Sequence, residues 1–314
     1  MNNTLKISII IPVYNSSQTL AECYNRLKIT MVDITEFWEI IFVDDGSIDN
    51  SWETINNICK SNKKNVGIKL KKNYGQHNAL LCGIRQAKYD YIITMDDDLQ
   101  NPPEEIPVLI KEIQNGYDVV YGYPREEKHG FLRNLASIIT KIALKATMGI
   151  KTARHVSAFR IFRTNLRESF TYYRGSFVSI DVLLSWSTNS FNAIPVKHLD
   201  RFVGYSNYTV KKLINHAFNM ITGFSVLPLQ IASIIGFLFS IFGFIILFFV
   251  LARYFIQGST VQGFPFLASI VSIFSGAQLL AIGIIGEYLS RMHFRTMDKP
   301  QYFIGEKLNL DSEN

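Results

Sequence analysis

Strand-like and helix-like segments alternate along the first 125 residues. Each strand-like segment is a short apolar run rich in β-branched residues, and the five of them are KISIIIPVY, WEIIFVDD, VGIKLKKN, DYIITMDDD and YDVVYGYP. The stretches between them, such as SSQTLAECYNRLKITMVD and GQHNALLCGIRQAK, carry apolar residues at helical spacing. Nearly continuous apolar strands that alternate with helices predict an α/β domain whose mainly parallel sheet is covered on both faces.

The predicted helices carry end signals. Ser16 or Ser17 is placed to cap the first helix. The helix after the fourth strand opens with Pro102 and acidic residues and closes at Gly116. These signals agree with the boundaries that the apolar spacing gives.

Two long apolar runs distinguish the C-terminal third. Residues 231–252 are 22 residues without a charge, and residues 264–286 are 23 more, with Gln278 as the one strongly polar side chain. Each run reaches the roughly 20 residues that a helix needs to cross the hydrocarbon core of a bilayer. Two buried helices of a soluble protein are the alternative. Two such runs with eleven residues between them favour a transmembrane hairpin.

Flanking charge predicts how the hairpin is oriented. The loop between the runs has one cation, Arg253, whereas several cations lie outside the hairpin: Lys211, Lys212, Arg291, Arg295 and Lys299. By the positive-inside rule, both termini are expected in the cytoplasm and the loop on the other side.

Residues 126–226 have a different pattern. FLRNLASIITKIALKATMG and SNYTVKKLINHAFNMITGFS are amphipathic at helical spacing and carry basic residues. The first either packs on the sheet or lies at the lipid interface, and the second favours the interface because it runs into the first apolar run. The chain is thus divided into residues 1–125, 126–226, 227–288 and 289–314, the last being a cytoplasmic tail.

The amino-acid composition indicates which kinds of binding partner to expect. The chain has 32 Lys and Arg against 26 Asp and Glu, a net charge of +6, which suits an anionic partner such as a membrane surface, a nucleotide or a polyphosphate. It has no long basic run or basic–aromatic stripe, so nucleic acid is not an expected partner. Cys23, Cys59 and Cys82 are far apart, which predicts free buried thiols in a reducing compartment. The first apolar run is short and contains Pro12, so it is no signal peptide.

Three adjacent aspartates end the fourth predicted strand. If the strand continues through them, Asp96 and Asp98 share one face and Asp97 points away. Two carboxylates on one face suit Mg²⁺ or Mn²⁺, and Mg²⁺ usually binds through one or two carboxylates plus substrate phosphates. The alternative is an acidic cap for the helix that opens at Pro102, a role that Asp98 alone can fill.

A second acidic pair, Asp44 and Asp45, ends the second predicted strand. Ligands of parallel α/β sheets bind at the carboxyl ends of the strands, where a carboxylate can accept a hydrogen bond from a base or a ribose hydroxyl. Helix capping by Asp45 or Ser47 is the alternative, and both roles can coexist.

These motifs carry a family resemblance. IPVYN, VDDGSIDNS, KNYGQHNALLCGI and MDDDLQNPPEEIP resemble the nucleotide-sugar-binding half of inverting family 2 glycosyltransferases of the GT-A fold. DRFVGYSNYTVKK, the double apolar run and GEYLSR resemble the polyprenyl-phosphate glycosyltransferases, which act on dolichyl or undecaprenyl phosphate. NYGQHNA and DLQNPPEEIP are most similar to the undecaprenyl-phosphate 4-deoxy-4-formamido-L-arabinose transferase branch. The resemblance covers nearly the whole chain.

The resemblance implies a Rossmann-like GT-A domain in the cytosol, followed by interfacial helices and a transmembrane hairpin. Residues 1–125 would bind the nucleotide sugar and residues 126–226 the acceptor. The implied nucleotide-sugar contacts are Pro12, Tyr14, Asn15, Asp44, Asp45, Asp96 and Asp97. The implied ligands of Mg²⁺ or Mn²⁺ are Asp96, Asp98 and Gln100, and the implied catalytic residues are Asp98, Arg125, Arg133 and Arg201. Guanidinium groups suit phosphate oxygens, although Arg133 also fits a solvated surface position.

The implied activity is transfer of a sugar from a UDP-sugar or dTDP-sugar to undecaprenyl phosphate, with inversion at the anomeric carbon. The product is a lipid-linked monosaccharide for the cell envelope. The implied location is the bacterial inner membrane, with the active site cytoplasmic, and related transferases with such hairpins often form homo-oligomers.

The chain also departs from the family pattern. Many relatives have an acid where this chain has Ala158, in SAFR, and Asp181 either takes over a sugar-facing role or is a surface acid. Two other functions stay open. A processive polysaccharide synthase would carry a QxxRW motif, which this sequence lacks, and an inactive nucleotide-sugar-binding membrane subunit would give no product.

Overall fold

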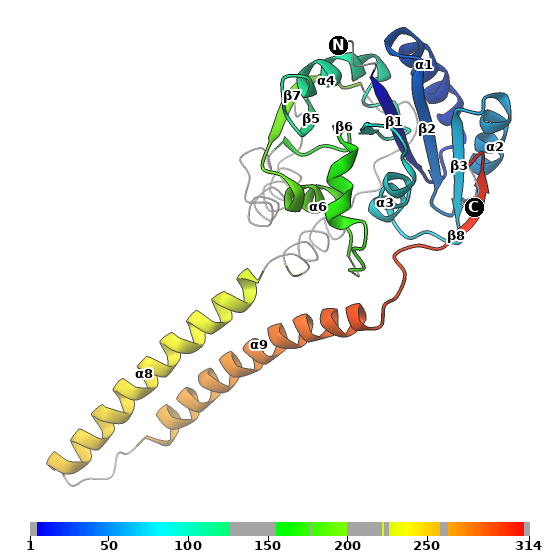
Figure 1. Ribbon diagram of the computed structural model, residues 1–314. Helices are drawn as coiled ribbons and strands as arrows, with labels where there is room; N and C mark the ends of the chain where they lie inside the picture. The colour runs from blue at the N-terminus through cyan, green and yellow to red at the C-terminus, as the bar shows by residue number, and fades with distance from the viewer. Residues whose placement is uncertain are drawn as a thin grey trace. The chain divides into compact units, whose positions relative to one another are not determined.

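The computed structural model describes residues 5–125, 155–175, 177–199, 222, 226–257 and 263–310 (Figure 1). The chain forms two compact units. The first comprises Met1–Ala217 and Lys299–Asn314, and the second comprises Phe218–Asp298. Both basic amphipathic stretches predicted between residues 126 and 225 lie outside the described residues, apart from Thr222.

The first part of the sheet unit follows the predicted alternation. Its elements are β1 (Lys6–Val13), α1 (Leu20–Ile34), β2 (Phe37–Asp44), α2 (Ser51–Ser61), β3 (Asn65–Leu70), α3 (Gln76–Gln86), β4 (Tyr91–Thr94), η1 (Pro103–Glu105), α4 (Ile106–Ile113) and β5 (Val119–Pro124). One predicted detail is wrong. Thr19 precedes α1, and no side chain caps the helix there. The carbonyl of Ser16 instead accepts hydrogen bonds from the N–H groups of Thr19 and Leu20.

Further elements complete the sheet unit. They are β6 (Arg160–Arg163), the 3₁₀ segment η3 (Thr164–Phe170), α6 (Ile180–Ser187), β7 (Phe191–Val196) and β8 (Ile304–Leu308). The sheet has eight strands in the order β7-β5-β6-β4-β1-β2-β3-β8. Four strand pairs are parallel and three are antiparallel, each of the three involving β6 or β8. The sheet is therefore mixed, with a parallel centre.

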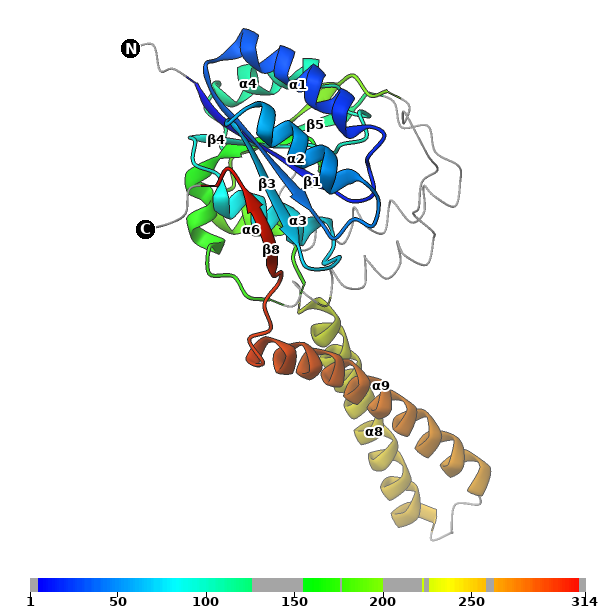
Figure 2. The ribbon, with the colours of Figure 1, turned by 90° about the vertical axis from the view of Figure 1, so that its right-hand side faces the viewer.

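Helices cover both faces of this sheet (Figure 2). A hydrophobic core cluster joins α1, α2 and α4 to one face, where Ile9, Phe42 and Ile93 are fully buried. On the other face α3 packs so closely that a Cβ on Gly83 would lie 2.5 Å from a methyl carbon of Ile10. Cys23, Cys59 and Cys82 are all buried and unpaired, which confirms the prediction of free buried thiols.

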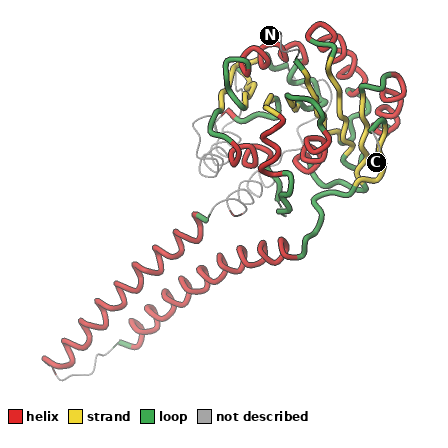
Figure 3. The backbone as a smooth tube through the Cα atoms, viewed as in Figure 1, coloured by secondary structure: helices red, strands yellow, loops and turns green. Residues whose placement is uncertain are grey.

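The second unit contains two long helices (Figure 3). α8 (Leu227–Gln257) and α9 (Phe264–Thr296) contact each other, for example through Phe239 and Phe274, whose ring centroids are 5.4 Å apart. Pro228–Ile246 and Ile273–Thr296 are long and apolar enough to cross a membrane, with mean hydropathies of 2.3 and 1.4. Both helices extend beyond the predicted runs at 231–252 and 264–286.

Residues 289–314, predicted as a tail, contain secondary structure. The first of them belong to α9, and β8 is an edge strand that pairs antiparallel with β3. Leu308 packs against the core, and the Asn309 amide donates hydrogen bonds to the carbonyls of Cys59 (2.7 Å) and Asn65 (2.9 Å). The chain therefore returns to the sheet after both apolar helices.

Candidate functional site

A cavity of about 240 Å³ lies at the carboxyl ends of β1, β2 and β4. It is lined by Pro12, Val13, Tyr14, Ser16, Asp45, Asn73, Gly75, Gln76, Asp96, Asp97 and Asp98. Each strand delivers its final residues to the same edge because β1 pairs in parallel with both β2 and β4. This is the edge where the sequence predicted a ligand.

The three aspartates after β4, Asp96–Asp98, are here called the acid turn, and all three line the cavity. The prediction that Asp97 points away from Asp96 and Asp98 is wrong, because β4 ends at Thr94 and the acids lie in the turn that follows. Asp96 accepts a hydrogen bond from the Gln76 side chain at 2.7 Å. A turn brings consecutive side chains to one side, which strand alternation cannot do.

The carboxyl group of Asp97 has a raised pKa. Burial, together with the charges of Asp96 and Asp98, raises this pKa to about 7, although a hydrogen bond from Ser16 lowers it. Its Oδ2 atom is buried and has no hydrogen-bond partner. A cation beside this oxygen would relieve both the repulsion and the unmet hydrogen-bonding need.

The acid turn fits a divalent cation. Carboxylate oxygens are the hard ligands that Mg²⁺ and Mn²⁺ prefer, and Mg²⁺ takes its remaining ligands from water and substrate phosphates. Within the described ranges, no group of three or more His, Cys, Asp or Glu side chains is placed to hold a metal ion. An ion at the acid turn would therefore be held by one or two of its carboxylates together with a phosphorylated ligand.

Asp45 shapes the cavity wall through the backbone. Its two carboxylate oxygens accept hydrogen bonds from the N–H groups of Tyr74 (2.7 Å) and Gly75 (2.8 Å). Gly46 has φ +71° and sits against the same loop, so that a Cβ there would lie 2.5 Å from the carbonyl carbon of Lys72. Residues 71–76, here called the wall loop, are thus held against the end of β2.

The wall-loop anchor predicts a pH-dependent stability. Burial raises the pKa of Asp45 to about 6, above its ordinary value of 3.8. A raised folded-state pKa gives stability that is present below about pH 4 and lost as the pH rises through about 6. In metal-free protein, the unfolding free energy of wild type minus that of Asp45→Asn should therefore fall by on the order of 2 kcal/mol between about pH 4 and pH 7. Denaturant titrations at several pH values measure this difference, and a flat difference would contradict the assignment.

Three predicted contact residues lie outside the cavity lining. Asp44 is fully buried, and its Oδ1 accepts a hydrogen bond from the Ser47 N–H at 3.2 Å. Asn15 accepts a hydrogen bond from the Ile48 N–H at 2.9 Å. The Gln100 amide lies 3.4 Å from the His198 ring. Each side chain organises a turn next to the site.

Of the three arginines predicted to be catalytic, one lies within the described residues. Arg125 is exposed directly after β5. Arg133 and Arg201 lie outside the described residues.

Sequence reasoning missed the contribution of the wall loop. Asn73, Gly75 and Gln76 line the cavity, and Gln76 connects α3 to the acid turn by its hydrogen bond to Asp96. The available signal was their position, since NYGQHNA follows a buried strand and opens a helix. Gly75 has φ +94°, a conformation that glycine adopts readily.

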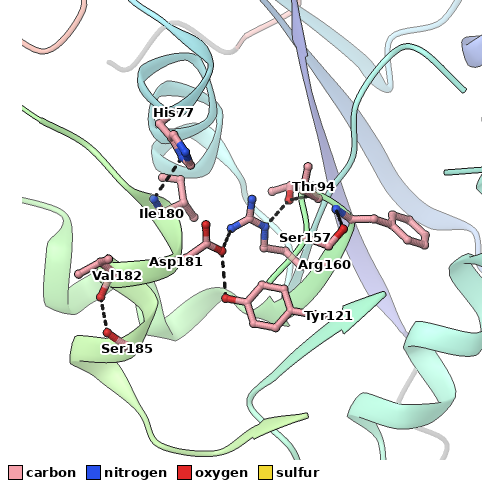
Figure 4. A network of polar contacts seen from close by, with 11 residues as sticks. His77, Thr94, Tyr121, Ser157, Arg160, Ile180, Asp181, Val182 and Ser185 are labelled. Atoms are coloured by element: carbon pink, nitrogen blue, oxygen red, sulfur yellow. Dashed lines mark hydrogen bonds and ion pairs between the residues drawn. The ribbon is translucent and has the colours of Figure 1, made fainter. Parts of the chain in front are cut away.

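A buried polar network lies beside the acid turn (Figure 4). Arg160, at the start of β6, forms an ion pair with Asp181 at the start of α6, and their exposed fractions are 2% and 5%. The Arg160 Nε donates to the Thr94 hydroxyl at 3.0 Å, and the Tyr121 hydroxyl donates to Asp181 at 3.0 Å. Thr94 is the last residue of β4, two positions before Asp96.

This network shows that Asp181 is not a surface acid. The carboxylate is buried, and its Oδ1 atom is engaged by Arg160 and Tyr121. Burial and the charge of Asp181 raise the pKa of Tyr121, so its hydroxyl stays a donor. The carbonyl of Ala158 accepts a hydrogen bond from the Thr94 hydroxyl at 2.7 Å. Asp181 therefore neutralises the buried charge of Arg160.

Comparisons with known proteins agree with this architecture. The family model described as "Glycosyl transferase family 2" matches residues 8–171. A protein of Photorhabdus laumondii named undecaprenyl-phosphate 4-deoxy-4-formamido-L-arabinose transferase is 32% identical over 98% of this chain and 96% of its own length. A protein of the same name from Pseudomonas aeruginosa is 33% identical over 95% of this chain and 89% of its own.

Among solved structures, glucosyl-3-phosphoglycerate synthase from Mycobacterium tuberculosis, bound to Mn²⁺, UDP-glucose and phosphoglyceric acid, matches with a TM-score of 0.52. It is 18% identical, and the match covers 70% of this chain and 78% of that one. At this identity the likeness concerns the fold.

Proposed function

The chain belongs to glycosyl transferase family 2, and from this premise we propose that it moves a sugar from a UDP-sugar or dTDP-sugar to the phosphate of undecaprenyl phosphate. The chain is a glycosyltransferase with a GT-A-like fold. The observation that carries the proposal is the acid turn, where three carboxylates line a cavity and one of their oxygens is buried without a partner. The near full-length similarity to transferases named for undecaprenyl phosphate supports the lipid acceptor.

Different cavity residues are proposed to bind different parts of the donor. Pro12 and Tyr14 offer an apolar and an aromatic surface for a pyrimidine base at the end of β1. Asp96, Asp98 and the unpartnered oxygen of Asp97 face the position of the diphosphate. A divalent cation bound there would neutralise charge on the diphosphate as it departs.

The reaction is a single displacement. An oxygen of the acceptor phosphate forms a bond to the anomeric carbon, while the bond from that carbon to the nucleoside diphosphate breaks and the diphosphate leaves with the electron pair. The acceptor phosphate has a second pKa of ~6 and is largely ionised near neutral pH, so no carboxylate has to remove a proton. This agrees with an Asp181 that is engaged by Arg160. The protein's task is to position the donor and stabilise charge.

The return of the chain to the sheet supports a membrane topology. Strands β7 and β8 belong to one sheet, although the two apolar helices separate them in the chain. We infer that both ends of the hairpin lie on the same side of the bilayer as the sheet unit. Together with the positive-inside rule, this supports the proposal that the site and both termini are in the cytoplasm of a bacterial cell and that α8 and α9 cross the inner membrane. Assembly into homo-oligomers is part of the same proposal.

Two measurements on the full chain in detergent test this function. With Mn²⁺ present, we expect one nucleotide sugar from a panel of UDP-sugars and dTDP-sugars to raise the melting temperature, by mass action. The same sugar, carrying a label, should then appear as a single unit on organic-extractable undecaprenyl phosphate. A long polymer would indicate a processive synthase instead, and nucleotide-sugar binding without any product would indicate an inactive binding subunit.

A further inference from the structure

The segment that follows the second apolar helix contacts the sheet unit on both flanks of the wall loop. This segment, residues 299–310, is here called the return segment, and it contains β8. It belongs to the sheet unit, as do β3 and α3, which precede and follow the wall loop. Both views of the ribbon show β8 running beside β3 (Figures 1 and 2).

The first attachment is at the end of β3. Leu70, the last residue of β3, pairs with Ile304, and the N–H of Lys71 donates to the carbonyl of Phe303 at 3.0 Å. At Gly305 a Cβ would lie 3.2 Å from the Lys71 side chain and 3.3 Å from the Lys69 carbonyl. The backbone is therefore fixed at the residue where the wall loop begins.

The second attachment is on α3. The Arg85 guanidinium donates to the side chains of Gln301 (3.2 Å) and Tyr302 (3.3 Å) and to the carbonyl of Tyr173 (2.9 Å). It also lies over the Tyr302 ring, 5.6 Å from its centroid. Gln301 donates to the same Tyr173 carbonyl. Three separate parts of the chain thus meet at Arg85 and hold α3.

The wall loop joins the end of β3, where the first attachment lies, to the start of α3, the helix that carries the second attachment in its last turn. Asn73 and Gly75 line the cavity, and Gln76, the first residue of α3, orients Asp96. A shift of α3 or of the end of β3 would move these groups relative to the acid turn. Groups displaced in this way would lose contacts to a bound nucleotide.

We propose that Gln301, Tyr302 and Phe303 are positioning residues for the nucleotide diphosphate, acting through Arg85 and Lys71 on the wall loop. The affinity of the cavity for a nucleotide then depends on a segment that lies some 230 residues later in the chain than the wall loop it supports. This inference rests on the proposed function, because it requires that the cavity binds a nucleotide.

The return segment supplies its own matched control. Asn309 anchors the far end of β8 to the carbonyls of Cys59 and Asn65, at the opposite end of β3 from the wall loop. Asn309→Ala and Arg85→Ala each remove side-chain hydrogen bonds from the same segment. Arg85→Ala releases the last turn of α3, the helix whose first residue, Gln76, contacts Asp96 in the cavity.

The test measures the Kd for UDP in the presence of Mn²⁺, and the KM and kcat for the nucleotide sugar, on the full chain in detergent. Loss of the Arg85 contacts should weaken UDP binding about 5- to 10-fold, as expected for one or two net hydrogen bonds, and raise KM with little change in kcat. Tyr302→Phe, which keeps the ring, should weaken binding about 2- to 5-fold. Asn309→Ala should lower the melting temperature but leave the Kd within about twofold.

Two results would overturn this inference and leave the proposed function intact. The first is an equal change in Kd in Arg85→Ala and Asn309→Ala. The second is an unchanged Kd in both Arg85→Ala and Tyr302→Phe. If Arg85→Ala does not fold, the Kd of Tyr302→Phe is compared with that of Asn309→Ala, and equal values would overturn the inference. If the wild-type chain binds dTDP in place of UDP, the same comparison is made with dTDP. A wild-type chain that binds neither UDP nor dTDP with Mn²⁺ would overturn the proposed function and this inference with it.

Discussion

Replacing Asp98 by Ala should abolish transfer of sugar from the nucleotide donor into lipid, with a loss of at least about 10³-fold. Asp98 lines the cavity in the acid turn after β4, with Asp96 and Asp97 beside it. Removing this carboxylate takes away one of the anionic groups proposed to hold the divalent cation, and charge stabilisation by such a cation is worth several kcal/mol in the transition state.

The measurement is incorporation of labelled sugar into organic-extractable lipid, accompanied by a Mn²⁺ titration of the variant. The matched control is Asp33→Ala, which removes an exposed carboxylate from α1 and should leave transfer unchanged. Full activity in Asp98→Ala, or a loss of activity with unaltered Mn²⁺ affinity, would refute the assigned role.

Replacing Asp181 by Ala should lower the unfolding free energy by about 3–5 kcal/mol. Arg160 is 2% exposed, and Asp181 is the one acidic partner that the described residues give it. Without that carboxylate, a guanidinium charge stays buried without compensation. The hydroxyl of Tyr121 also loses its acceptor. We expect the combined Arg160→Met, Asp181→Leu variant to be less destabilised than Asp181→Ala, because it buries no unpaired charge.

A second Arg–carboxylate pair of this chain provides the control. Arg26 and Glu104 form a bidentate pair at 2.9 and 2.7 Å, and the Glu104 side chain is 54% exposed. Glu104→Ala should cost less than about 1 kcal/mol, since water screens and solvates exposed pairs. Denaturant or thermal unfolding of the three variants measures the contrast. Equal losses in Asp181→Ala and Glu104→Ala would show that burial of the Arg160 pair is unimportant.

Helices and strands with long apolar runs could be predicted from the local sequence pattern. β1 and β2 have eight residues each, and α1 to α4 carry apolar stripes that face the sheet. β6 has four residues and β8 has five, and their partners β4 and β3 lie far away in the sequence. Short strands whose pairing is non-local leave little periodicity to detect, which is why these strands were missed.

The candidate site was likewise predicted only in part from the sequence. Strand-end position and residue type were enough to select Asp45, Asp96, Asp97 and Asp98, which all line the cavity. The orientation of Asp97 was not predictable, because it depends on the strand ending at Thr94. The partner of Asp181 was not predictable either, because Arg160 reaches it through the packing of α6 against β5 and β6.

The place of β8 in the chain also determines when the sheet unit can finish folding. A ribosome makes β3 early, but the strand that covers its outer edge is not made until residues 304–308, after both apolar helices. Until then the nascent sheet ends in β3, whose unpaired backbone groups can recruit other strands. Both α8 and α9 are therefore synthesised before the strand that completes the sheet. A chain released before residue 304 would carry both apolar helices together with an open sheet edge, and we expect cells to treat it as a substrate for quality-control proteases.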